Sequence, residues 1–366
     1  GAPPAPNWKP SCARSNRADP LDKRFAGRQG RAMSFRTVLT DPMLRMLVAA
    51  IAVAALLPAT GDARGWAQMV ANAAIFVLFL LNGMRIARRD IVDGFANWRF
   101  LVPLVLWVFG AMALVGLALA SIGQGLLAPS VALGFLYLGT LPSTVQSATS
   151  YSSLAGGNVA LSVVGAALLN ILGVFVTVPL FLALGGSGSG AVGMEVIGKI
   201  MLLLILPFAI GQAVQGFTSG FIAQHKPKIA WIDRFAISAA VYVAFSGAVE
   251  QGIWSRVAGI DWAVIGALVA AFLLAGNLGA WLAGGALRLQ RADRIAFLFA
   301  GAQKSAAVGA PLATILFPPE EAGFMVIALL LYHFFQLVVA APIASRLASS
   351  PHRLESAGYG APTTRS

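Results

Sequence analysis

Residues 140–153 read Thr-Leu-Pro-Ser-Thr-Val-Gln-Ser-Ala-Thr-Ser-Tyr-Ser-Ser and lie between two long apolar segments. Pro142 removes a backbone donor and clashes with the preceding helical turn, so a helix through this stretch must bend or unwind. Nine of the fourteen side chains are serine, threonine or glutamine, and they cannot all face lipid. In a membrane, broken backbone is tolerated only where it is buried in protein or lines a cavity. The stretch therefore predicts a broken helix beside a polar cavity.

The composition around this stretch is that of a membrane protein. Of 366 residues, 58% are hydrophobic and 11% are charged, and the mean hydropathy is +0.78. Soluble domains are about 45–50% apolar and about 25% charged, so a soluble enzyme is excluded. The single cysteine excludes a disulfide framework and a four-cysteine metal site, and three histidines leave little room for a metal cluster. These counts argue against a metal cluster, and we expect no cofactor other than a possible sodium ion.

Apolar segments long enough to cross a bilayer recur along the chain. A hydrocarbon core about 30 Å thick takes roughly 20 apolar residues per helix. This length predicts ten spans, at residues 43–59, 66–87, 98–120, 126–153, 158–184, 193–215, 228–250, 261–287, 293–315 and 323–347. The predicted fold class is an all-α, polytopic membrane protein with ten transmembrane helices.

The charge distribution predicts how these spans are oriented. Cationic residues accumulate on the cytoplasmic side. With the N-terminus inside, 22 of the 26 Lys and Arg residues are cytoplasmic, and only Arg64 and Arg256 are outside. We therefore expect both termini in the cytoplasm of a bacterial inner (plasma) membrane, with membrane lipid as a partner and no nucleic acid. Residues 1–42 predict a basic, disordered tail and residues 348–366 a cytoplasmic C-terminal tail.

The two halves of the chain resemble each other. Leu168-Leu169-Asn170 is followed by Pro179, and Leu331-Tyr332-His333 is followed at the same spacing by Pro342, at an offset of 163 residues. This offset predicts a first five-helix repeat over 43–187 and a second over 193–347. Five is odd, so the second repeat enters the membrane from the opposite side. Such inverted repeats are typical of secondary transporters.

The ninth span is also broken, at Gly301-Ala302-Gln303-Lys304-Ser305. A charged side chain near the middle of a span costs roughly 2.5–3.5 kcal/mol and usually marks a substrate or ion pathway. No carboxylate lies well inside a span to pair with Lys304, so its ammonium requires carbonyls, water or an anionic ligand. Half-helix N-termini favour anions and unwound carbonyls favour cations. Two broken helices can thus bind an organic anion beside a coupling cation; a structural lysine bonded to carbonyls is the alternative.

Four motifs carry a family resemblance. They are Leu-Pro-Ser-Thr at 141–144, Ala-Gly-Gly-Asn at 155–158, Gly-Ala-Gln-Lys-Ser at 301–305 and Tyr-His-x-x-Gln-Leu at 332–337. Over residues 41–347 the chain resembles the bile acid:sodium symporter family (SBF-like, solute carrier 10-type), in its divergent bacterial branch. The resemblance implies a panel domain of helices 1, 2, 6 and 7 and a core domain of helices 3–5 and 8–10. It also implies that helices 4 and 9 cross at the substrate and sodium sites.

The resemblance carries over only part of a sodium site. Ser162 matches a hydroxyl ligand and Gln303 matches the glutamine ligand, so these two residues are the possible sodium site. Phe299 stands where the family has a glutamate, Lys304 where it has an asparagine, and Ala166 where it has a threonine. A lysine that replaces the coupling cation, coupling to protons and no coupling therefore all stay open.

The sequence thus predicts a secondary transporter of a small organic anion, coupled to sodium and working by alternating access between panel and core. The alternative is a non-transporting or proton-coupled protein of the same fold that has lost the sodium sites. The candidate substrate- and ion-binding residues are Asn82, Ser143, Thr144, Ser147, Thr149, Asn158, Ser162, Gln303, Lys304, Ser305 and His333.

Two catalytic or relay interpretations are weaker. His333 precedes Gln336 by one helical turn, and a satisfied core hydrogen bond between helices is favoured over a proton relay. Ser246 before Gly247, with His333 as base, would be an incomplete intramembrane protease motif. We therefore expect no enzyme.

Overall fold

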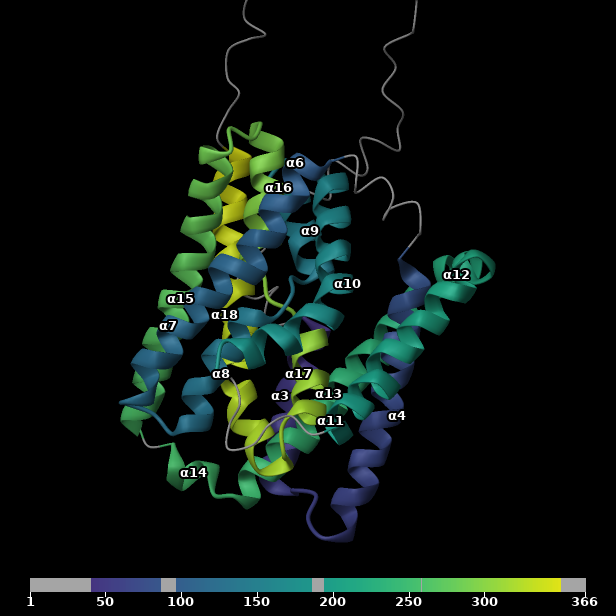
Figure 1. Cartoon of the computed structure of the whole chain (residues 1–366), viewed down its shortest axis with the longest axis vertical. Coiled ribbons are helices and arrows are strands. Elements are labelled where there is room, and N and C mark those ends of the chain that lie inside the picture. Colours follow the sequence, from purple (N-terminus) through teal and green to yellow (C-terminus); the bar gives the residue numbers. More distant parts are fainter. Residues whose placement is uncertain (1–40, 87–96, 186–193, 258, 350–366) are drawn as a thin grey trace, which may run out of the picture. The chain divides into compact units, whose positions relative to one another are not determined.

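The computed structural model describes residues 41–86, 97–185, 194–257 and 259–349, and Figure 1 shows their helices in chain order. All regular structure within these ranges is helical, with no strand. Most of both predicted tails, residues 1–40 and 350–366, lies outside the described residues. At the inner boundaries, the first helix already begins at Pro42, with Asp41 as its N-cap, and the last extends to Ser349.

Helices occupy every predicted span. Eight helical segments are long and apolar enough to cross a membrane, and α3 and α8 are shorter apolar helices. The elements are α3 (Pro42–Leu56), α4 (Asp62–Arg85), α6 (Trp98–Val105), η1 (Leu106–Ala111), α7 (Met112–Gln124), α8 (Pro129–Thr140), α9 (Val145–Leu154), α10 (Val159–Ala183), α11 (Met194–Ile200), η2 (Met201–Ile205), α12 (Leu206–Gln224), α13 (Lys226–Glu250), α14 (Ile253–Arg256), α15 (Gly259–Ala286), α16 (Arg291–Ala302), α17 (Ala306–Leu316) and α18 (Pro319–Ser349). The prediction of an all-helical membrane protein is confirmed at this level.

The two predicted helix breaks are present. α8 ends at Thr140 and α9 begins at Val145, so residues 141–144 are non-helical around Pro142. Residues 303–305 likewise separate α16 from α17. We call these the first break (141–144) and the second break (303–305).

Helix α12 is longer than predicted and ends at Gln224 instead of residue 215. Polar residues lower the hydropathy of this last part without preventing helix formation. The Thr218 hydroxyl, for example, donates to the Val214 carbonyl one turn earlier, at 3.1 Å. A hydropathy window therefore underestimates the helix.

Wider π-helical turns interrupt two of the long helices, and no periodicity predicted them. η1 lies between α6 and α7, and η2 lies between α11 and α12. Pro207 follows η2 and has no N–H for the usual i→i−4 bond, which gives the change of register a local cause. In η1 the register of the backbone hydrogen bonds changes over residues 106–111, and this segment includes Val108.

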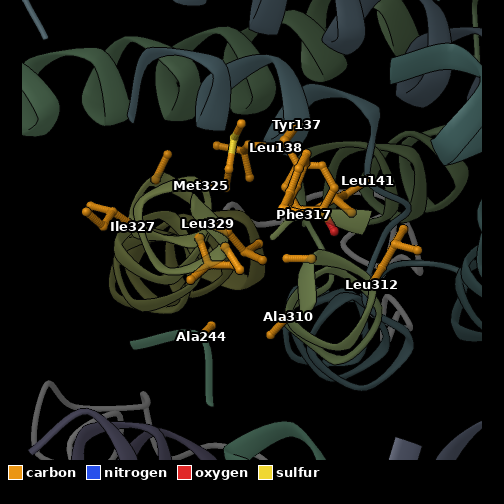
Figure 2. Packing of buried hydrophobic residues seen from close by; sticks show 14 of the residues in the cluster. Tyr137, Leu138, Leu141, Ala244, Ala310, Leu312, Phe317, Met325, Ile327 and Leu329 are labelled. Atoms are coloured by element: carbon orange, nitrogen blue, oxygen red, sulfur yellow. The ribbon is translucent and has the colours of Figure 1, made fainter. Parts of the chain in front are cut away.

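Helices α8, α17 and α18, next to the two breaks, share one apolar core, while the buried apolar side chains of α9 and α16 belong to a second one. Figure 2 shows side chains of α8, α17 and α18 meeting in the first of these cores, with Ala244 of α13 beside them. Glycines allow the backbones to approach closely: a Cβ atom at Gly134 of α8 would lie 2.6 Å from the Met325 carbonyl oxygen of α18. Between α13 and α18, a Cβ at Gly247 or Gly323 would overlap the backbone oxygen of Pro319 or Ala244. No side chain therefore separates α13 from α18 at these points.

Polar contacts join the ends of helices that are far apart in sequence. Arg64, at the start of α4, forms ion pairs with Glu250 at the end of α13 and with Glu320 at the start of α18, the latter at 3.7 Å. At the other end of α4, Arg85 pairs with Asp233 of α13 at 2.7 Å. These contacts connect α4 at both ends to α13.

Candidate functional site

The first break leaves five consecutive carbonyls, 139–143, whose partners come from outside α8 and α9. Helix α10 supplies two of these partners. The Thr177 hydroxyl donates to the Thr140 carbonyl at 3.0 Å, and the Asn170 amide donates to the Ser143 carbonyl at 2.7 Å. Buried carbonyls without a partner would cost free energy, so these isolated polar residues of an apolar helix stabilise the break.

The second break supplies the other three partners. The Lys304 ammonium donates to the carbonyls of Gly139 and Leu141, both at 2.8 Å. The Ser305 backbone N–H donates to the Pro142 carbonyl at 2.9 Å. The two breaks are therefore in direct contact, and every carbonyl from 139 to 143 accepts a hydrogen bond.

Helix α18 holds the second break in turn. The Gln336 side chain accepts from the Lys304 N–H at 2.8 Å and donates to the Lys304 carbonyl at 3.1 Å, so it bonds both backbone groups of that residue. The Tyr332 hydroxyl donates to the Ala302 carbonyl at 2.5 Å. His333 Nδ1 lies 2.9 Å from Gln336 Nε2. This bond lies within α18, between residues one turn apart, whereas we predicted a hydrogen bond of His333 between helices; His333 is linked to the second break through Gln336.

Lys304 is fully buried where its span is broken. Its Nζ reaches a third carbonyl, that of Val108 in η1, at 3.2 Å. Among the described residues, no carboxylate forms an ion pair with it. The sequence left carbonyls, water and an anionic ligand as possible partners of the ammonium, and the structure shows carbonyls.

Side chains of α9 face the second break. The Ser147 hydroxyl donates to Gln303 Oε1 at 2.9 Å, and Ser147 and Thr144 are in hydrogen-bond contact with each other. The Thr144 side chain does not cap α9, whereas Ser305 caps α17 by accepting from the Val308 N–H at 3.3 Å. The first N–H groups of α9 are therefore not capped by the residue that precedes the helix, and a helix N-terminus of this kind favours an anion.

Unpartnered hydroxyls adjoin this helix. The Ser143 hydroxyl, two residues before α9, is fully buried and has no hydrogen-bond partner within the described ranges. The hydroxyl oxygens of Thr149, a half-buried residue of α9, and of Ser162 in α10 also lack a hydrogen-bond partner there. Free hydroxyls of this kind can serve a ligand that the chain itself does not provide.

One face of α9 is polar and exposed. Gln146 and Ser150, one turn apart, are exposed, and Thr149 is half-buried. Because polar side chains at membrane depth usually face a water-filled cavity, this face is a candidate cavity wall. Gln146 and Ser150 belong to the polar run in the sequence but were not among the candidate residues. A helical wheel of residues 145–154 would have placed both on the same polar face.

Two candidate residues make contacts away from the breaks. Asn158 caps α10 by accepting from the Leu161 N–H at 3.1 Å, and its amide donates to Asp293 at 2.8 Å. Asn82, on α4, accepts from Arg85 at 3.3 Å. In the part of the chain that is described, no hydrogen bond links either side chain to the first or second break.

The predicted sodium ligands differ in their surroundings. Gln303 Oε1 already accepts from Ser147, whereas the Ser162 hydroxyl has no partner inside the described segments. Phe299, where the resembled family has a glutamate, is fully buried, and its ring centroid lies 5.8 Å from that of Tyr151. That position is therefore apolar.

Comparison with known proteins identifies relatives over most of the chain. The model of the SBF-like CPA transporter family matches residues 41–349. An uncharacterized protein of Pseudomonas aeruginosa is 36% identical, over 86% of this chain and 95% of the relative. "Putative symporter YfeH" of Escherichia coli is 35% identical, over 87% of this chain and 96% of the relative.

A more distant relative is "Sodium/bile acid cotransporter 7" of Mus musculus, which is 22% identical over 83% of this chain and 91% of the relative. These matches confirm the resemblance that the broken-helix motifs indicated. Together with the eight long apolar helices, they make the chain an integral membrane protein. It belongs to the SBF-like CPA transporter family.

Proposed function

We propose that the protein is a secondary transporter of a small organic anion that works by alternating access. The observation that carries the proposal is the meeting of the two breaks beside α9, whose N-terminus is uncapped and whose polar face is exposed. Helix N-termini beside unwound backbone are where secondary transporters bind anionic groups. Ser143, Thr144 and Ser147 are the residues that we propose contact the anion.

The ten-helix arrangement belongs to the same proposal. With the N-terminus inside, the contacts of Arg64 with Glu250 and Glu320 join three helix ends that the charge distribution assigns to the outer side. The Arg85–Asp233 pair likewise joins two ends assigned to the cytoplasmic side. This agreement supports ten crossings, two inverted five-helix repeats and cytoplasmic termini in a bacterial inner membrane. Arg64→Cys and Arg85→Cys, each introduced into a Cys12→Ala background, should be labelled from opposite sides of the membrane.

The names of the relatives support transport of an organic solute. One relative is named a symporter, and another is named for sodium and bile acid. For this chain we propose the broader class of organic anions; if the carrier were coupled to sodium, Ser162 and Gln303 are the residues that would hold the ion. The apolar Phe299 favours the second candidate, a protein of this fold that has lost cation coupling.

Uptake into proteoliposomes tests the proposal. We expect that the purified full chain takes up at least one member of a labelled panel of aliphatic carboxylates, aryl sulfonates and steroid carboxylates. Gln146→Ala, on the exposed face of α9, should reduce uptake, whereas Gln124→Ala, exposed at the end of α7, should not. If no panel member is taken up under any imposed ion gradient, or if both variants behave alike, the proposed site is wrong.

A further inference from the structure

The surroundings of the Lys304 ammonium resemble the ligand set of a small cation. Three backbone oxygens face it: Gly139 and Leu141 at 2.8 Å and Val108 at 3.2 Å. Two come from the end of a helix, where carbonyls carry the negative end of the helix dipole, and the third comes from a π-helical turn. Unwound carbonyls and half-helix C-terminal ends are the groups that coordinate sodium in transporters with broken helices.

The ammonium uses all of its donors in this environment. A lysine ammonium has three N–H groups, and three carbonyls accept from it. The side chain is fully buried. A direct bond to a substrate carboxylate would require one of these hydrogen bonds to break and leave a buried carbonyl unpaired. The geometry therefore indicates that the Lys304 ammonium is bound by the three carbonyls of the protein and is not available to a substrate anion.

The position of this charge gives it a role between the two breaks. Lys304 belongs to the second break, while two of its acceptors belong to the end of α8 and the first break. A dissociable cation in the same place would bind the two breaks together only while it is present. A covalently attached ammonium cannot dissociate from this place.

We propose that the Lys304 ammonium is a built-in cation that occupies a coupling-ion position among the Val108, Gly139 and Leu141 carbonyls, so that substrate binding and transport do not require sodium. The uptake consequence rests on the proposed transport function. The occupancy of the carbonyl site by the Lys304 ammonium does not rest on the proposed transport function. The occupancy and the uptake can therefore be tested separately.

The first experiment measures the melting temperature of the detergent-purified full chain in sodium, potassium, choline and methylammonium chloride at equal ionic strength. The wild-type protein should melt at the same temperature in all four salts. Lys304→Ala should melt at a lower temperature in choline, which is too large for the vacated site, and should recover most of the loss in sodium or methylammonium, because a bound cation stabilises the folded state.

Two variants serve as controls. Lys304→Met fills the same space with apolar atoms, so it should melt at a lower temperature in every salt, without recovery. Lys199→Ala removes an exposed lysine whose ion-pair partner is Glu195 on the same helix, so it should behave as the wild type does. A sodium-specific rise in the wild-type melting temperature would overturn the proposal. So would a folded Lys304→Ala variant that neither small cation stabilises.

The second experiment measures proteoliposome uptake of an anion that the carrier accepts, with sodium or choline outside. Wild-type uptake should be the same in both, within about a factor of two, and Lys304→Ala should require sodium or methylammonium. Sodium-dependent wild-type uptake would refute the built-in cation even if Lys304→Ala does not fold. If no anion is taken up at all, the proposed function fails, while the melting series still decides whether Lys304 fills a cation site.

Discussion

The break at residues 141–144 and the break at residues 303–305 contribute opposite groups to their contact. The first break and the preceding end of α8 present carbonyl oxygens, and the second presents an ammonium and a backbone N–H. Their supports also differ: α10 donates to the first break through two separate side chains, whereas α18 bonds both backbone groups of Lys304 through Gln336. Each broken helix thus depends on the other one and on the helix that follows it.

This difference teaches that a broken helix inside a membrane protein needs partners that match its exposed groups. An acceptor-rich break is stable only beside donors, and a buried charge is stable only beside oriented dipoles. Removing one support should therefore have an effect that depends on how many buried groups lose their partner. The following three substitutions test this in order of decreasing effect.

Gln336→Leu should have the largest effect because it leaves both the N–H and the carbonyl of Lys304 unpaired. We expect the free energy of unfolding to fall by about 2 kcal/mol or more. Equilibrium unfolding in mixed micelles measures this. Gln124→Leu, at an exposed position on α7, is the control and should change little. If Gln336→Leu costs no more than the substitutions of α10 residues below, the second break does not depend on this side chain.

Asn170→Leu should have an intermediate effect. Its amide donates to the Ser143 carbonyl and also, at 2.8 Å, to the Ala166 carbonyl of its own helix. The Asn277 amide donates to the Leu273 carbonyl of its own helix at 2.9 Å, a bond of the same type as that of Asn170 to Ala166. Asn277→Leu is therefore a matched control. We expect Asn170→Leu to cost about 1–2 kcal/mol more than the control in the same unfolding assay. Equal costs would show that the bond to the first break contributes nothing.

Thr177→Val should have the smallest effect, because it removes one hydroxyl hydrogen bond and keeps the side-chain shape. Single hydrogen bonds between membrane helices contribute on average about 0.6 kcal/mol, and we expect a loss of that order. Thr314→Val removes a bond to Pro311 within its own helix and is the matched control. A Thr177→Val variant as costly as Gln336→Leu would contradict the ranking.

The location of both breaks could be predicted from the sequence because proline, glycine and a charge within an apolar span have strong local consequences. Pro142 and the Gln303-Lys304-Ser305 run lie in the breaks that are observed. The supporting residues could not be predicted in the same way. Thr177 is one of few polar residues in α10, and Tyr332 and Gln336 belong to the motif at 332–337, but only the packing of these helices reveals which backbone group each one reaches.

The predicted site residues show the same limit. Ser147, Gln303 and Lys304 lie together because two breaks that were predicted separately meet. Asn158, the last residue of the motif at 155–158, and Asn82 were placed among them from the sequence, and the structure shows Asn82 in contact with Arg85 and Asn158 in contact with Asp293. The sequence pattern also did not indicate η1, so the Val108 carbonyl had no reason to be a candidate partner of Lys304.

The glycine contacts between α13 and α18 have a consequence for movement. Where Gly247 meets Pro319 and Gly323 meets Ala244, backbone lies against backbone, and the contact consists of dispersion forces without a side-chain hydrogen bond. These two glycine contacts can separate without leaving a backbone donor or acceptor unpaired, and the polar contacts that would have to yield are the ion pairs of Arg64 with Glu250 and Glu320. Gly323→Ala would add a methyl group that overlaps the Ala244 carbonyl oxygen. It would keep α13 and α18 apart at this end, while the rest of each helix remains intact.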